Sequence, residues 1–441
     1  MLDSCIVPSF AVLLQQFVGC FTAPSFVSFS WLASGWVLNL RRHTVTETVR
    51  AAQAVGAKHI SSFHRFFSRG RWITDEVGMV MVRLVVSLLD PKRPIVVPID
   101  DTLGRHTGKR IAAASMHRDP LLSTGKRPFF HWGHVWVVLS INVYCFEKTW
   151  ALPVLFRLYR SKKRCVQDGR VHRKTTELAR ELVRLLAAAL PDRKLIVVGD
   201  AAYTNATLIK GRPRNVTLIG RSRLDAALYA PPPQPRRRRG RPRVRGARVR
   251  SPGQRAARKD ARWQRVRITV YGKTVTVRIL IIDALWYVAA GGELVRLVLV
   301  RGFPGHDHDD VFVSTDPTLS PQTIIQTFGQ RWALEVSFFH SKGRLGFEDP
   351  QNRTEHAVER TAPMALWSYS LVVIWYVTCG QHLRAARLPV LPWYESKALP
   401  SFGDMLATLR RASWLERISL PCADVPTLRK RLRPILEYAA A

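Results

Sequence analysis

Acidic residues are scarce in this 441-residue sequence. It contains 32 Asp and Glu residues against 68 Lys and Arg residues, which gives a formal net charge of +36 and a pI near 11.1. Such an imbalance argues against a small-molecule enzyme with a neutral surface and favours a polyanionic partner, of which nucleic acid fits best. Because 47% of the residues are hydrophobic, the chain can still fold around a large core, in two or three domains.

Cysteine is also scarce, and its spacing excludes two kinds of site. The six cysteines lie far apart and include no CxxC pair, so neither a structural zinc site nor a disulfide framework is indicated. This usage is typical of a reducing compartment, and we expect a cytoplasmic protein. The six residues are Cys5, Cys20, Cys145, Cys165, Cys379 and Cys422.

Long uninterrupted hydrophobic runs are missing as well. The apolar stretch 6–29 is interrupted by prolines and glutamines, and no Lys or Arg precedes Arg41, which argues against a signal peptide. The apolar segment Met364–Cys379 is short for a membrane span. We therefore predict that both segments form buried core helices and that the protein has no membrane partner.

The N-terminal region, residues 1–90, is predicted to be helical. Two short helices, Thr44–Val55 and Ile60–Phe67, are expected on either side of Gly56, and a third over Asp75–Leu89. The helices have basic flanks, so the pattern is compatible with a helix-turn-helix reader of DNA. Small helical bundles use the same pattern, and the sequence leaves both interpretations open.

Residues 91–221 show the alternation of an α/β fold. Three adjacent strands followed by alternating helix and strand predict a layered fold with a mixed sheet. The strands are expected at Pro94–Ile99, His134–Tyr144, Thr149–Leu158, Lys194–Val198 and Asn215–Ile219, and the main helix at Glu177–Leu190.

Acidic residues follow two of these strands. Asp100 and Asp101 come after the first strand, and Asp200 follows the strand that ends at Val198. Packing explains such residues poorly, because Asp is disfavoured in strands and rarely buried without a partner. The alternative is an Asp that forms a turn. Converging carboxylates suit two divalent cations about 4 Å apart, and Mg²⁺ prefers oxygen ligands.

Residues 222–319 are predicted to form a basic, β-rich insertion. Arg236–Arg267 contains fifteen basic residues against one acid and is expected to stay disordered without a partner. Within it, Arg239 and Arg241 flank a glycine, as in a minor-groove hook, although generic phosphate binding is the alternative. Strands are then expected at 267–282 and 294–301. The His/Asp run 306–310 is interpreted as a solvated loop, with adventitious metal binding as the alternative.

A long helix is predicted at Gln322–Leu345. Ser320 is a suitable N-cap, Pro321 suits the first helical position, and Gly346 can end the helix. At about 100° per residue, four side chains of different chemistry fall on one face of this helix. Such a face is either an ordinary salt-bridged surface or part of a catalytic site. The four are Phe328, Arg331, Glu335 and Lys342.

These residues resemble those of the prokaryotic DDE transposases of insertion sequences, of the type with a Tyr-x2-Arg-x3-Glu-x6-Lys helix. Here the helix reads Phe328-x2-Arg331-x3-Glu335-x6-Lys342, with Phe in place of Tyr. The first acids precede Thr102 in an Asp-Asp-Thr sequence, and the second lies in Gly-Asp-Ala-Ala-Tyr. The family also places a β-rich insertion before the catalytic Glu.

The resemblance implies an RNase H-like catalytic core made of residues 91–221 and 320–350, followed by a helical C-terminal region, 351–441. It implies that Asp100 or Asp101, Asp200 and Glu335 hold two Mg²⁺ ions, for which Mn²⁺ can substitute. Arg331, Lys342 and Phe328 would then contact DNA. The partners would be transposon ends and target DNA, with a homodimer on DNA. A nuclease without strand transfer and a repurposed DNA-binding protein are the alternatives.

Overall fold

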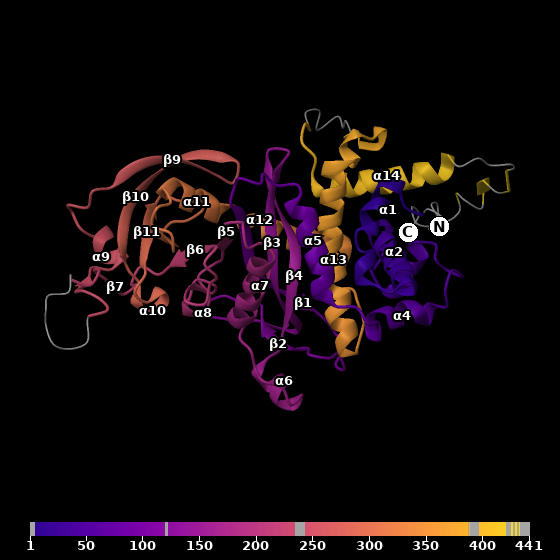
Figure 1. Ribbon diagram of the computed structural model, residues 1–441, viewed down its shortest axis with the longest axis horizontal. Helices are drawn as coiled ribbons and strands as arrows, with labels where there is room; N and C mark the ends of the chain where they lie inside the picture. Colours follow the sequence, from indigo (N-terminus) through magenta and orange to yellow (C-terminus); the bar gives the residue numbers. More distant parts are fainter. Residues whose placement is uncertain are drawn as a thin grey trace.

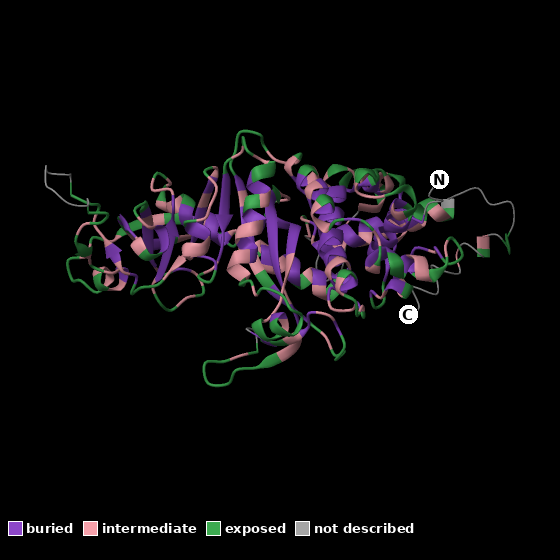
Figure 2. Cartoon of the chain, turned by 60° about the horizontal axis from the view of Figure 1, so that its bottom comes forward, coloured by how far each residue is buried: buried purple, intermediate pink, exposed green. Residues whose placement is uncertain are grey.

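The computed structural model describes residues 5–119, 122–233, 243–386, 388, 397–419, 425–426, 428–429 and 432. The molecule is elongated, with a long β-sheet that runs from its middle to one end and a helical region at the other end (Figure 1). Buried residues continue through the sheet into the helical region (Figure 2). The predicted α/β class with a mixed sheet and helices at both ends of the chain is confirmed.

Five strands form the centre of the sheet in the order β4–β3–β1–β5–β6. The first strand, β1, pairs antiparallel with β3 and parallel with β5, and β5 pairs parallel with β6. The combination of antiparallel and parallel neighbours makes this the mixed sheet that was predicted. The strands are β1 (Ile95–Arg105), β3 (Phe130–Cys145), β4 (Lys148–Tyr159), β5 (Leu195–Val198) and β6 (Val216–Ser222), with β2 (Ser115–Arg118) beside β3.

The first strand is longer than predicted. We expected it to end at Ile99, but β1 continues to Arg105 because β3 provides hydrogen-bonding partners as far as Gly133. Asp100 and Asp101 therefore lie inside a strand, not in a loop after it. Since neighbouring residues of a strand point to opposite faces, the two carboxylates cannot share one face of the sheet.

Helices cover both faces of the central sheet. The strongly amphipathic α7 packs against β3 and β4, with Leu182 and Leu186 fully buried. Helices α12 (Trp332–Leu345) and α13 (Glu355–Thr378) also pack against β4, where Trp367 of α13 donates a hydrogen bond to Val154 O at 3.2 Å. The helices between the strands are α6 (Lys162–Gln167), α7 (Thr175–Ala189) and α8 (Ala206–Ile209).

The strands of residues 222–319, where a β-rich insertion was predicted, extend the central sheet. Strand β12 pairs antiparallel with β6, with Phe312 opposite Arg221, and β11, β10, β7 and β8 continue the order. The hairpin β9–β10 turns at Tyr271 and Gly272, which both have positive φ. The elements are β7 (Leu228–Tyr229), β8 (Arg248–Val249), α9 (Pro252–Ala256), β9 (Gln264–Val270), β10 (Lys273–Leu285), α10 (Tyr287–Ala290), β11 (Leu294–Arg301) and β12 (Asp310–Ser314).

Part of the basic segment is folded, which corrects the prediction that the whole run is disordered. In its described part, residues 243–267, Ser251 and Gln254 form a capping box at the start of α9. Arg245 stacks over the rings of Tyr229 and Tyr287, at 4.1 and 4.7 Å from their centres. Tyr229 of β7 and Tyr287 of α10 thus hold an arginine that the local sequence alone would leave in solvent.

The helical end of the molecule is built around α13, whose side chains are mostly buried, as predicted for Met364–Cys379. The described helices include none that is both long and apolar enough to cross a bilayer. An aromatic cluster that includes Phe66 and Trp72, stacked 5.0 Å apart, packs the N-terminal helices together. The elements are α1 (Pro8–Gln15), η1 (Val18–Cys20), α2 (Ala23–Leu38), α3 (Val45–Ala51), α4 (Ile60–Ser68), α5 (Thr74–Val86), α13 (Glu355–Thr378), η2 (Gly380–His382), η3 (Arg384–Ala386) and α14 (Phe402–Ser419).

Candidate active site

The two neighbouring aspartates of β1 have different partners. Asp100 points to the face that carries α12, where its Oδ2 lies 2.5 Å from Arg331 Nη1. Asp101 points to the other face, where its Oδ2 accepts a hydrogen bond of 2.6 Å from the hydroxyl of Tyr203. Only 1% of Tyr203 is exposed, so this hydroxyl is held firmly in place.

Asp200 lies two residues after β5, at the predicted strand end, and it forms the turn that the sequence left open as the alternative. Its Oδ1 accepts hydrogen bonds from the backbone nitrogens of Ala202 and Tyr203, at 2.9 and 3.1 Å. A Cβ on Gly199 would lie 2.7 Å from Cβ of Tyr203, so this turn requires glycine. Among the described residues, none donates a hydrogen bond to Asp200 Oδ2, so that oxygen can bind another ligand.

The predicted long helix is two helices, α11 (Pro321–Gly329) and α12 (Trp332–Leu345). At the junction the backbone bonds change to the i→i−3 pattern, since Arg331 N binds Phe328 O and Leu334 N binds Arg331 O. The predicted ends are confirmed: the Ser320 hydroxyl caps the first helix, and Gly346 ends the second with a φ of 60°. The break follows Gly329, a weak helix former that our sequence reasoning did not use, and it coincides with the start of the candidate site.

Arg331 lies at this break and joins two of the predicted acids. Its Nη1 contacts Asp100, and its Nη2 lies 2.7 Å from Glu335 Oε1. The guanidinium is only 16% exposed, which strengthens both ion pairs relative to a surface salt bridge. The charge of Asp200 also acts on Arg331 and helps to raise its pKa. Arg331 thus binds Asp100 and Glu335 directly, and Asp200, which follows β5, acts on the same guanidinium through its charge.

The electrostatics of Asp100 are unusual for a carboxylate. Burial raises its pKa to about 7, and the charges of Asp200 and Asp101 act in the same direction, against the opposing effect of Arg331. One guanidinium therefore does not fully compensate the negative charge at this edge of the sheet. Oxygen ligands with excess negative charge fit divalent cations such as Mg²⁺ or Mn²⁺.

The acids are not gathered tightly, however. Asp100, Asp200 and Glu335 do not form a cluster in which the ligand atoms all lie within 4.8 Å of one another; among the described residues, only His306, His308 and Asp310 do. Arg331 explains the spacing, because its guanidinium lies between Asp100 and Glu335. The three carboxylates fit a metal site, but the guanidinium of Arg331 lies between two of them, Asp100 and Glu335.

The two other residues of the predicted helix face are also placed by the structure. Lys342 Nζ donates a hydrogen bond of 2.7 Å to Leu103 O, so α12 is tied to β1 three residues beyond Asp100. Phe328 is 6% exposed, and its ring packs against Phe312 with centres 4.7 Å apart. The predicted DNA-contacting residues Arg239 and Arg241 lie outside the described residues.

Tyr203 is the site residue that our sequence reasoning missed. It was noted only as part of the Gly-Asp-Ala-Ala-Tyr sequence, with no role of its own. A tyrosine three residues after a strand-end aspartate is a weak signal, because tyrosine is common in cores. Its contact with Asp101 depends on the parallel pairing of β1 with β5, which the local sequence does not reveal.

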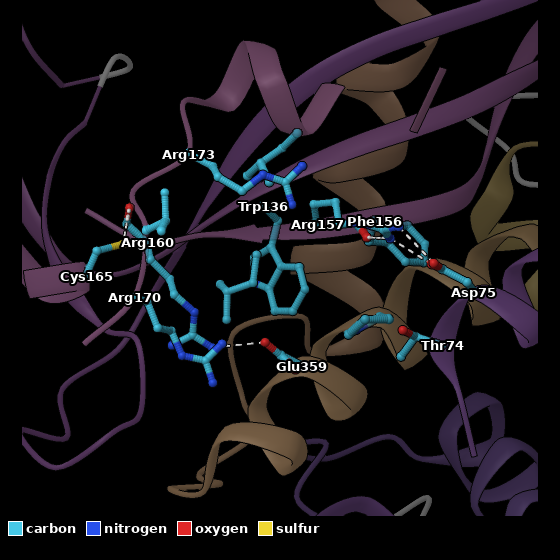
Figure 3. Close-up of a pocket in the computed structure, with 14 residues that line it drawn as sticks. Thr74, Asp75, Trp136, Phe156, Arg157, Arg160, Cys165, Arg170, Arg173 and Glu359 are labelled. Atoms are coloured by element: carbon cyan, nitrogen blue, oxygen red, sulfur yellow. Dashed lines mark hydrogen bonds and ion pairs between the residues drawn. The ribbon is translucent and has the colours of Figure 1, made fainter. Parts of the chain in front are cut away.

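A pocket of about 480 Å³ lies beside Trp136, whose strand position is opposite Thr102 in β1 (Figure 3). Of the predicted site residues that the structure describes, none lines it. Acids neutralise the four arginines in its wall, so the pocket is no free anion site. The pairs are Arg157 with Asp75 and Glu181, Arg160 with Glu355 and Glu359, Arg170 with Glu355, and Arg173 with Glu181.

Comparison with known proteins gives a family. No curated protein matches the sequence. Among solved structures, the chain is similar to a cryo-EM structure of a piggyBac transposase synaptic complex with hairpin DNA, with 10% sequence identity and a TM-score of 0.41, over 97% of this chain and 81% of that one. A family model described as DDE superfamily endonuclease matches residues 16–278, which is more than half of the chain and includes both β1 aspartates and Asp200. This protein therefore belongs to the DDE superfamily of endonucleases.

Proposed function

We propose that this protein is a DNA transposase of the insertion-sequence type, which cuts the ends of a mobile element and joins them to target DNA. The observation that carries the proposal is the bridge that Arg331 forms between Asp100 of β1 and Glu335 of α12, with the charge of Asp200 acting on the same guanidinium. Membership of an endonuclease superfamily and the net charge of +36 support it from independent directions.

In this proposal Asp100, Asp200 and Glu335 hold two Mg²⁺ ions, which Mn²⁺ can replace. When bound, the cations supply an activated water or DNA 3′-hydroxyl and stabilise the leaving oxygen of the phosphodiester. Asp200 contributes its free Oδ2, because backbone N–H groups hold its other oxygen. Asp100 is preferred to Asp101 as first ligand, since it shares Arg331 with Glu335 while Asp101 is bound to Tyr203.

We propose that Arg331 has one role before DNA binds and another afterwards. Without DNA it neutralises Asp100 and Glu335; when DNA binds, a phosphate competes for the same guanidinium, because Arg pairs with phosphate as readily as with carboxylate. The carboxylates are then freed for cations. DNA binding and metal binding would thus favour one another.

We assign the remaining predicted DNA contacts differently. Lys342 is half-buried beside β1, and we propose that it reaches DNA backbone next to the cut. For Phe328 we propose a packing role instead of the DNA contact, because its ring is buried under Arg331. Arg239 and Arg241 remain candidates for the minor groove or for generic phosphate contacts. Joining two element ends requires two sites, so we propose a homodimer on DNA.

A nuclease that cuts without joining is the second candidate, since the same carboxylates serve both reactions. The deciding experiment incubates the purified full-length protein with labelled DNA that carries the inverted repeats flanking its gene, together with a target plasmid and Mg²⁺. A transposase gives both cut ends and joined products. Cleavage without joined products would favour the nuclease, and neither product, in the presence of specific end binding, would favour a repurposed DNA-binding protein.

A further inference from the structure

The His/Asp run that we expected to be a solvated loop is only partly one. In the sequence His-Asp-His-Asp-Asp, the alternate residues His306, His308 and Asp310 are brought together, with potential ligand atoms all within 4.8 Å of one another. The chain bends at residues 307 and 308 before β12 begins at Asp310, and this bend brings the three side chains together. The intervening Asp309 points elsewhere and binds Arg301 through both oxygens.

Asp310, the third residue of this group, is part of the protein core. Asp310 begins β12, and its side chain is fully buried. Arg221 on the neighbouring strand β6 pairs with its Oδ1, while His306 Nδ1 lies 2.6 Å from its Oδ2. His308 Nε2 approaches Oδ1 at 3.7 Å. The prediction of a solvated loop is therefore wrong for Asp310 and holds best for His308, which is 65% exposed.

The two imidazoles are arranged in parallel. The rings of His306 and His308 are stacked with an interplanar angle of 8° and centres 5.3 Å apart. On its other side His306 packs against the buried ring of Phe303, also at 5.3 Å. Gly302 and Gly305, with φ of 80° and 82°, make the turns that bring this segment back over the start of β12.

We propose that His306, His308 and Asp310 bind a divalent transition-metal cation of the zinc class, separate from the carboxylate site. Zinc is held by imidazole nitrogens and carboxylate oxygens at about 2.0–2.2 Å, which places tetrahedral ligands about 3.4 Å apart. To reach that geometry the exposed His308 ring must move slightly, and the cation must replace the hydrogen bond of 2.6 Å between His306 Nδ1 and Asp310 Oδ2, whose atoms then separate. The fourth position is left to solvent.

The chemistry of the group selects against the cations proposed for the catalytic acids. Two of the three ligands are nitrogens, which suit Zn²⁺ or Co²⁺ and not Mg²⁺. Arg221 neutralises the single carboxylate and also fixes its orientation, so attraction by net negative charge is weak. Affinity must therefore come from the imidazoles.

The site is connected to the candidate active site by direct contacts. Phe303, which supports His306, touches Tyr271 with ring centres 6.1 Å apart, and Tyr271 touches Trp332 at 6.3 Å. Trp332 is the first residue of α12 and directly follows Arg331. A cation bound at the histidines would thus fix the loop that supports the beginning of the helix carrying Glu335.

The test measures binding of Zn²⁺ and Co²⁺ to the full-length protein in competition with a chelator, without DNA. We expect one tightly bound ion in the wild-type protein and in the Asp200→Asn/Glu335→Gln variant. Affinity should fall at least tenfold in His308→Ala and in His306→Ala/His308→Ala. Co²⁺ should give the absorption bands of a tetrahedral site, and these should vanish in both histidine variants. His356→Ala, at another exposed histidine, is the matched control.

Three outcomes would overturn the proposal, and the first two are a wild-type protein that binds no Zn²⁺ and a His308→Ala variant that binds it as tightly as wild type. His308 is exposed, so its substitution tests the site even if the double variant folds poorly. Loss of binding in Asp200→Asn/Glu335→Gln alone would locate the zinc at the catalytic acids and also reject the separate site. None of these results depends on whether the protein is a transposase.

Discussion

Arg331 lies between Asp100 and Glu335 and binds one carboxylate through each terminal nitrogen, at 2.5 and 2.7 Å. The guanidinium thus lies between two of the proposed metal ligands. Ion pairs buried to this extent depend on one another, because removal of one partner leaves the other charges uncompensated. The relationship makes Arg331 a competitor of the cations as well as a proposed DNA contact.

Substitution of Arg331 should therefore have opposite effects on stability and metal affinity. We expect Arg331→Ala to lower the melting temperature in chelator, because Asp100 and Glu335 lose their only close cation among the described residues. The rise in melting temperature on adding Mn²⁺ should be larger than in wild type. Arg344→Ala, an exposed arginine on the same helix, is the control. An equal response to Mn²⁺ in both variants would contradict the competition.

The two aspartates of β1 should differ in their contribution to catalysis. We expect Asp100→Asn to lower DNA cleavage at least 100-fold, because it removes a proposed metal ligand. Asp101→Asn should lower it less, since it weakens only the contact with Tyr203, and Tyr203→Phe should have an effect similar to Asp101→Asn. Cleavage assays with Mg²⁺ compare the three variants. The opposite ranking of Asp100→Asn and Asp101→Asn would make Asp101 the first ligand.

Asp100 should also make stability depend on pH. Its pKa is about 7 in the folded protein against an ordinary value of 3.8, so the folded protein binds this proton more tightly than the unfolded chain does. In chelator, the contribution of Asp100 to stability should decrease as pH rises from about 4 to about 7 and then level off. Asp100→Asn cannot titrate and should gain stability relative to wild type over this window. Denaturant titrations of both proteins at several pH values measure the difference; a difference that does not vary with pH would refute the shift.

Much of this site could be read from the sequence because its acids follow local rules. Asp200 follows a short apolar strand after one glycine, and Glu335 lies on the second of two consecutive helices that begin at the Ser320 cap and end at Gly346. The apolar residues in the strands and helices of the central sheet likewise recur every few residues, so the sequence shows them directly. Such features depend on neighbours within a few residues, which the sequence displays.

The features that were missed depend on long-range partners. β1 extends past Ile99 because β3 pairs with it, and the insertion joins the sheet because β12 pairs with β6. The contact between Tyr203 and Asp101 spans 102 positions of the chain. Neither propensity nor spacing shows which strands become neighbours. A mixed sheet could therefore be predicted from the sequence, but its individual strand pairs could not.

Phe328 lies near the end of α11, and its side chain should contribute to stability more than to DNA binding. The resemblance to insertion-sequence transposases suggested a DNA contact at this position, where the family has tyrosine, but the Phe328 ring is buried against Phe312. We expect Phe328→Ala to lower the free energy of unfolding by about 3–5 kcal/mol, the cost of deleting a large buried aromatic side chain. Phe328→Leu, which fills most of the space, should cost less and leave the affinity for DNA unchanged. Denaturant unfolding and DNA-binding titrations separate the two roles: loss of DNA affinity in a stably folded Phe328→Leu protein would restore the DNA contact and reject the packing role.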